Sequence, residues 1–281
     1  MSNMVFLMIL GAALVHASWN ALVKADVDRI ALIKVMFLTQ FACSACLIPF
    51  VAFPALESWP YLCASAILGT GYMVFLTWAY RFGDLSHVYP FARGIAPLIV
   101  AIVSVVFLDE QMSQIGEVAV VLIALGVVSL ALTRGAAGLR EPRSVLLSFA
   151  AGGFVGAYTI TDALGARTAG SPHGYMVWVS LVYAVLVAGS FKLLHRRRVA
   201  RIVGRSRRNG IVSGIMSYGS SWVAIWAFTL APMALVSALR ETSTVFAVII
   251  GVFFLHERLS LTRLASIATT LTGTTVLKLS R

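Results

Sequence analysis

Apolar residues occur along this chain in long uninterrupted stretches that short polar segments separate. Ten stretches are long enough to cross about 30 Å of hydrocarbon at about 1.5 Å per helical residue. A membrane β-barrel would instead alternate apolar and polar positions, so the continuous runs favour helices. The pattern predicts an all-α integral membrane protein with ten transmembrane helices, over residues 4–23, 30–52, 60–80, 85–108, 114–133, 144–166, 174–193, 210–230, 233–255 and 261–279.

The chain repeats part of its pattern at an offset of 147 residues. Arg93 and Glu110 recur at that offset as Arg240 and Glu257. Because each half holds five spans, an odd number, the second half enters the membrane from the opposite side, which predicts an inverted repeat. We expect two five-helix repeats, 1–140 and 141–281, that together form one membrane domain.

The composition and charge agree with a membrane protein. Hydrophobic residues make up 59% of the chain and charged residues 12%, against about 25% charged in a typical soluble domain. The net charge of +11 would suit nucleic acid, but eight of the 22 Lys and Arg lie between Lys192 and Arg208, in one loop between two spans. This placement predicts contact with anionic lipid headgroups and no nucleic-acid partner. By the positive-inside rule, the basic loops are cytoplasmic and both termini extracytoplasmic.

The sequence gives no support for an enzyme. It holds no nucleotide-binding motif, zinc-binding His pair or nucleophile elbow, so we expect no cofactor and no metal. The three cysteines, Cys43, Cys46 and Cys63, lie in or at the ends of apolar stretches and are interpreted as packing residues. No basic residue precedes the first apolar run, which predicts an uncleaved first helix.

Two arginines lie inside predicted spans. A charged side chain there costs about 2.5 to 3.5 kcal/mol on insertion scales and usually faces a cavity or a partner. Arg93 and Arg240 each lie some seven residues into a span, which predicts positions toward opposite faces of the membrane. They could capture a carboxylate or phosphate as successive anion contacts. The alternative is a structural ion pair, for instance Arg240 with Asp162, or snorkelling.

Further polar and aromatic residues in the spans are candidates for lining a substrate site. We interpret the following as substrate-binding together with the two arginines: His16, Trp19, Asn20, Tyr72, Tyr158 and Trp222. Asp162 and Glu241 could carry a coupling proton if they are shielded from water, and a structural carboxylate is the alternative for each. Glu110 and Glu257 precede Ser113 and Ser260, which are expected to cap spans five and ten.

The chain resembles EamA-type members of the drug/metabolite transporter (DMT) superfamily. The resemblance is carried by the five-plus-five plan, by Trp19-Asn20, and by Pro97 followed thirteen residues later by Glu110. The second copy departs from this pattern with Thr244 in the place of Pro97. The family is generally drawn with both termini in the cytoplasm, opposite to the charge count.

We expect a secondary transporter, an exporter or facilitator of a small metabolite such as an amino acid or organic anion, in the inner or plasma membrane. Alternating access would occur by rocking of the two halves about a site between spans one, three, four, six, eight and nine. The alternatives are a protein that translocates a lipid or lipid carrier and an exporter of cationic drugs. The expected partners are the small-molecule substrate and membrane lipids, and a homodimer is left open.

Overall fold

The structure is a computed structural model, which describes all residues except 83–84, 133–141, 195–203, 256–259 and 280–281. The described residues form eleven α-helices and two short 3-10 helices, and they contain no strand. The α-helices are α1 (Asn3–Ala25), α2 (Arg29–Leu47), α3 (Trp59–Phe82), α4 (Leu85–Val106), α5 (Gln114–Leu132), α6 (Pro142–Thr168), α7 (Pro172–Leu194), α8 (Gly204–Phe228), α9 (Met233–Arg240), α10 (Ser243–Leu255) and α11 (Leu261–Leu279). The 3-10 helices are η1 (Ile48–Phe50) and η2 (Leu56–Ser58).

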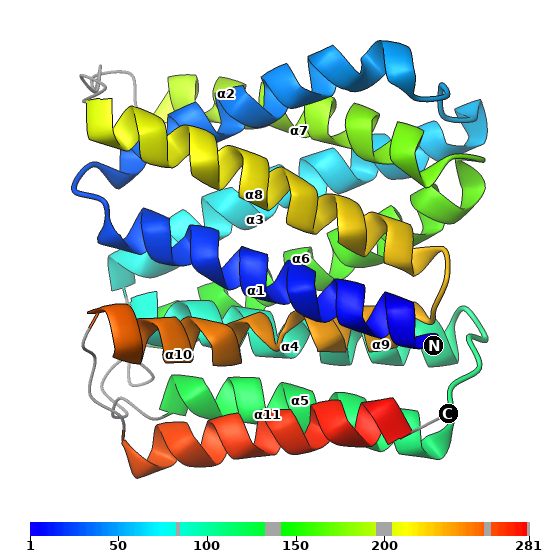
Figure 1. Cartoon of the computed structure of the whole chain (residues 1–281), viewed down its shortest axis with the longest axis vertical. Helices are drawn as coiled ribbons and strands as arrows, with labels where there is room; N and C mark the ends of the chain where they lie inside the picture. Colours follow the sequence, from blue (N-terminus) through cyan, green and yellow to red (C-terminus); the bar gives the residue numbers. More distant parts are fainter. Residues whose placement is uncertain (83–84, 133–141, 195–203, 256–259, 280–281) are drawn as a thin grey trace.

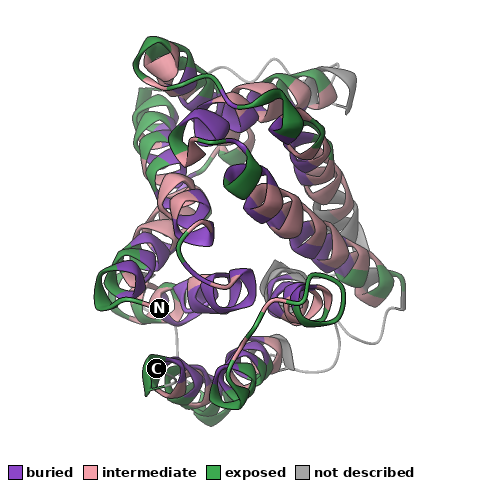
Figure 2. Cartoon of the chain, turned by 90° about the vertical axis from the view of Figure 1, so that its right-hand side faces the viewer, coloured by how far each residue is buried: buried purple, intermediate pink, exposed green. Residues whose placement is uncertain are grey.

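Every predicted span is helical within a few residues of its predicted limits. Six helical segments of the described part are long and apolar enough to cross a membrane: Asn3–Ala25, Arg29–Phe50, Val145–Thr168, Pro172–Ser190, Gly204–Phe228 and Met233–Phe254. Their outward sides carry large apolar residues, such as Met4, Leu7 and Leu14 on α1, which are between 46% and 64% exposed. Figure 2 shows these exposed faces on the outside of the helix assembly. The prediction of an all-α, multi-pass membrane protein is confirmed.

The helices run side by side across the molecule, and both termini lie at the same end (Figure 1). Helices from the two halves of the sequence are interleaved: α3 packs on α6, α5 on α11, and both α1 and α2 on α8. Two consecutive pairs, α3 with α4 and α6 with α7, make far smaller contacts, whereas α4 and α5 pack closely. The two halves of the sequence are therefore not spatially separate bodies.

Close packing between α2 and α8 depends on two glycines. A Cβ at Gly210 would lie 2.6 Å from Val35 Cβ and 2.9 Å from the Leu32 carbonyl oxygen. A Cβ at Gly214 would lie 2.8 Å from the Met36 carbonyl oxygen. Since real Cβ contacts are longer, only glycine lets the two backbones approach this closely.

The predicted ninth span is not one continuous helix. α9 ends at Arg240 and α10 begins at Ser243, with the break at Glu241 and Thr242. The predicted span over 233–255 is therefore present, but two helices make it up instead of one. The helix with the proline behaves in the opposite way, because α4 continues through Pro97 from Leu85 to Val106.

Candidate functional site

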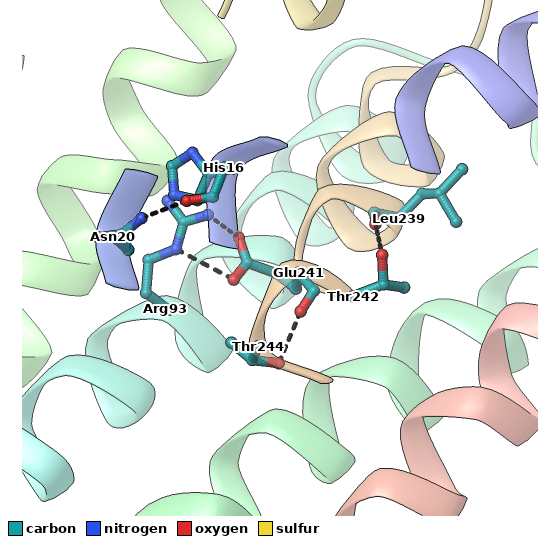
Figure 3. Close-up of polar contacts among 7 residues, drawn as sticks. All are labelled: His16, Asn20, Arg93, Leu239, Glu241, Thr242 and Thr244. Atoms are coloured by element: carbon teal, nitrogen blue, oxygen red, sulfur yellow. Dashed lines mark hydrogen bonds and ion pairs between the residues drawn. The ribbon is translucent and has the colours of Figure 1, made fainter. Parts of the chain in front are cut away.

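A buried ion pair joins the break in the ninth span to α4. Arg93 Nη2 lies 2.8 Å from Glu241 Oε1, and Arg93 Nε donates to Glu241 Oε2 at 3.1 Å (Figure 3). The two side chains are only 5% and 4% exposed. Two parallel bonds between a guanidinium and a carboxylate fix orientation as well as distance. Arg93 is thus held by Glu241, and the pair crosses from the first half of the chain to the second.

The local sequence explains why Glu241 lies at a break. The backbone N–H groups of Glu241 and Thr242 donate to carbonyls three residues back, at Ala238 and Leu239, which tightens the last turn of α9. The Thr242 hydroxyl donates to the Leu239 carbonyl at 2.7 Å, and the Thr244 hydroxyl to the Glu241 carbonyl at 2.7 Å. Threonine hydroxyls thus bond to backbone carbonyls at the discontinuity. The run Glu-Thr-Ser-Thr inside an apolar span was the available sequence signal for it.

Residues of α1 approach the ion pair from one side, as Figure 3 shows for His16 and Asn20. The Asn20 side chain donates to the His16 carbonyl on its own helix at 2.8 Å. His16 and Trp19 pack edge to face with ring centroids 4.9 Å apart. Within the described part of the chain, the buried His16 Nε2 and Trp19 Nε1 have no hydrogen-bond partner. Buried polar atoms are normally paired, so these two unpaired atoms mark this region as a candidate site for a polar ligand.

Arg240 lies in the same region but in a different state from Arg93. Its side chain is partly buried, and among the described residues it makes no hydrogen bond and no ion pair. It is near enough to Arg93, Glu241 and Tyr158 to interact with them electrostatically. Its guanidinium therefore has no hydrogen-bond acceptor among the described residues.

The prediction that the two arginines lie toward opposite faces of the membrane is wrong. Arg93 and Arg240 interact electrostatically with each other, and both do so with His16. The reason is geometric: each Cα lies within about one helical turn of the middle of its span, and the long side chains close the remaining gap. The two arginines therefore belong to one cluster.

Asp162 lies on α6 within electrostatic range of Arg240, yet the two form no ion pair. Ser65 on α3 and Tyr175 on α7 both donate to Asp162 Oδ1, the tyrosine at 3.2 Å. The suggested Arg240–Asp162 ion pair is thus absent. The sequence reasoning missed Ser65 and Tyr175, since neither residue type stands out in an apolar stretch.

The aromatic candidates divide between two places. Tyr72 and Tyr158 pack with centroids 6.2 Å apart, and Tyr158 interacts electrostatically with both arginines. Trp222 instead donates from Nε1 to His173 Nδ1 at 2.7 Å, at the first turn of α7. Trp222 therefore lies toward the helix ends, which suits an interfacial anchor better than the predicted pocket residue.

A second polar network lies at the end of the molecule that carries the termini. Arg167, near the end of α6, donates to Glu110 at 2.7 Å and to the carbonyls of Phe228 and Ala231. Glu110 also accepts from the backbone N–H of Met233 at the start of α9. Glu110 is therefore a structural residue. Its predicted counterpart Glu257 lies outside the described residues.

Both predicted serine caps are confirmed. The Ser113 hydroxyl accepts from the Gly116 N–H, and the Ser260 hydroxyl from the Arg263 N–H. The described residues contain no group of three or more His, Cys, Asp and Glu side chains that could hold a metal ion.

At the opposite end, Asp26 follows α1 and binds the first turns of α8. It accepts from the Ser206 hydroxyl at 2.7 Å, from Asn209 Nδ2 at 2.8 Å and from the Asp28 N–H at 3.0 Å. Burial alone would raise the pKa of Asp26, but these hydrogen bonds and the nearby Arg205 hold the pKa below its usual value. The loop after α1 is thus fastened to the second half of the chain.

Comparison with known proteins agrees with this architecture. No curated protein matches the chain, whereas 29 chains of solved structures do. One crystal structure covers 99% of this chain and 99% of its own, with a TM-score of 0.80 and 18% sequence identity. At this identity the likeness shows the fold alone.

The family is shown by a family model rather than by a single relative. The model of the EamA-like transporter family matches residues 3–132 and again residues 142–279. Since the two matches together span nearly the whole chain, the protein belongs to the EamA-like transporter family, within the DMT superfamily.

Proposed function

We propose that the protein is a secondary transporter of a small metabolite with an anionic group, such as an amino acid or an organic anion, and that Arg240 contacts that group. The observation that carries the proposal is the uncommitted guanidinium of Arg240 beside the paired Arg93 and Glu241. A planar fork of donors suits a carboxylate or phosphate. An unpaired cation in a span is costly, so its presence there fits a role in binding.

The polar atoms around Arg240 support a site for a small molecule. His16 Nε2 and Trp19 Nε1 offer two further unpaired positions. Tyr72, Tyr158 and Asn20 complete the proposed lining from α3, α6 and α1. The ion pair between Arg93 and Glu241 positions the break. Glu241 can bind a coupling proton only when its ion pair with Arg93 is broken.

The break itself suits transport. Discontinuous helices near mid-membrane are a common device for placing backbone and charge at a substrate site. A break held by one ion pair and two hydroxyls can change its angle without unpacking a continuous helix. Because the halves are interleaved, the moving units in alternating access combine helices from both halves, for instance α1 with α8.

The membrane arrangement is part of the proposal. Ten spans in two inverted repeats, 1–140 and 141–281, are supported by the double match of the family model and by the helices at all ten predicted stretches. We place the protein in the inner or plasma membrane with both termini outside, on the positive-inside rule. A cytoplasm-only fluorescent reporter fused after Arg281 should stay dark; fluorescence would overturn this orientation.

The function is tested by ligand-induced thermal stabilisation of the purified protein. The ligands are standard L-amino acids, organic acids, phosphorylated metabolites, lipid headgroup compounds and cationic drugs. A ligand at 100 times its dissociation constant adds about 2.7 kcal/mol to the folded state. Anionic or zwitterionic solutes should stabilise the parent but not Arg240→Gln. Stabilisation by lipid-like or cationic compounds alone, equal in the variant, would contradict the proposal.

A further inference from the structure

Asp162, Ser65 and Tyr175 form a polar cluster that the anion site does not use. The three residues come from α6, α3 and α7, and the hydroxyls of Ser65 and Tyr175 both donate to one carboxylate oxygen, Oδ1. Ser65 is 5% exposed and Tyr175 is fully buried. The tyrosine hydroxyl also lies 3.4 Å from the Thr161 carbonyl oxygen, which helps to fix its position.

This arrangement orients the carboxylate and leaves half of it free. With both hydroxyls on Oδ1, the other oxygen, Oδ2, has no hydrogen-bond partner among the described residues. Asp162 is only partly buried, and Oδ2 is not among the fully buried polar atoms without a partner. An ionised carboxylate in a membrane span requires a partner for each oxygen or a cation beside it.

The position of Asp162 near Arg240 indicates which kind of ligand could bind the free carboxylate oxygen. The two opposite charges interact electrostatically but are farther apart than an ion-pair contact. Each side chain therefore keeps polar atoms without a partner among the described residues, and each lies within electrostatic range of a charge of opposite sign. A molecule with one cationic and one anionic group would satisfy both side chains together.

We propose that Asp162, oriented by Ser65 and Tyr175, binds an ammonium group of the transported solute. This inference rests on the proposed function, since Arg240 takes the anionic group of the same molecule. The substrate is then a zwitterion rather than a simple organic anion. Ser65 and Tyr175 act as positioning residues, and Asp162 is the residue that touches the ligand.

The test compares matched ligands that lack one charge. For the standard L-amino acid that stabilises the parent most, affinities are measured by calorimetry alongside the corresponding acid without the amino group and the amine without the carboxylate. The parent should bind the amino acid about 10- to 100-fold more tightly than the deaminated acid, the value of a hydrogen bond between charged groups. Asp162→Asn should abolish this preference while still binding the deaminated acid.

Two further variants keep the test decisive if Asp162→Asn fails to fold. Ser65→Ala and Tyr175→Phe each remove one hydroxyl and keep the carboxylate, and each should reduce the preference for the amino acid. Tyr218→Phe is the matched control, because the Tyr218 hydroxyl contacts Ser44 instead. It should leave the preference unchanged.

The outcomes separate the two proposals. Equal binding of amino acid and deaminated acid by the parent, with loss of both in Arg240→Gln, would overturn the ammonium site and leave the anion site standing. Stabilisation by sodium chloride that depends on Asp162 would assign the site to a metal cation and also overturn the inference. If no amino acid or organic acid binds, both proposals fail.

Discussion

Arg93 and Glu241, separated by 148 positions in the chain, hold each other through two bonds of 2.8 and 3.1 Å at the break between α9 and α10. Arg93 lies in α4, and Glu241 lies between α9 and α10. The ion pair therefore fixes the end of α9 to a helix from the other half of the chain. The contact distinguishes two arginines that look equivalent in the sequence, because Arg93 is paired and Arg240 is not.

Breaking this pair should be strongly destabilising. Arg93→Gln or Glu241→Gln alone leaves one buried charge unpaired, and each should lower the free energy of unfolding by about 3 to 5 kcal/mol. The double variant should cost less than the sum of the two, as measured by urea unfolding in detergent. Arg167 and Glu110 provide the comparison: Arg167 is 33% exposed, so their coupling should be about 1 kcal/mol or less. Simple additivity for Arg93 and Glu241 would show that the pair does not hold the break.

The two threonine hydroxyls at the break should contribute more to transport than similar hydroxyls within continuous helices. Thr242→Val and Thr244→Val each remove a side-chain hydrogen bond to a backbone carbonyl, at a cost of about 1 kcal/mol in unfolding free energy. Both should also slow transport into proteoliposomes, because the break positions Glu241. The control is Thr275→Val on α11, whose exposed hydroxyl bonds to the Leu271 carbonyl within a continuous helix. Equal transport by all three variants would argue against a functional break.

The hydrogen bonds of Asp26 predict that the stability of the folded protein decreases at acidic pH. Since the pKa of Asp26 is lowered in the folded protein, its contribution is fully present above the usual aspartate value of about 3.8 and is lost as the pH falls through the lower folded value. Asp26→Asn should therefore be less stable than the parent at pH 7, and the difference should shrink below about pH 4. Ser206→Ala should reproduce part of the loss at pH 7. A constant difference across this range would exclude Asp26 as the titrating group.

Much of this molecule could be predicted from the order of its residues. The span limits follow from apolar runs that leave few alternatives in lipid, and the caps at Ser113 and Ser260 follow from local chemistry. The partner of each buried charge did not follow, because pairing depends on how helices distant in sequence are rotated and interleaved. Arg93 could not be assigned to Glu241 rather than to a ligand without the placement of α4 beside α9.

The break shows a second limit of sequence patterns. Thr244 stands where the first copy has Pro97, yet the helix is interrupted just before Thr244 and continues through Pro97. In α4 the chain continues through the proline. In the ninth span, hydroxyl groups and the paired carboxylate stabilise the interruption. The surrounding contacts, rather than the single residue, decide where a helix is interrupted.

Under the proposed function, Arg240 binds the anionic group of the ligand and does not stabilise the fold. The direct test measures both properties in Arg240→Gln: ligand affinity by calorimetry and unfolding free energy without ligand. We expect affinity for the anionic or zwitterionic ligand to fall about 10- to 100-fold, while the ligand-free protein keeps or gains stability, because an uncommitted charge has been removed from a span. Unchanged affinity together with a large loss of stability would make Arg240 a structural residue and overturn its role in binding.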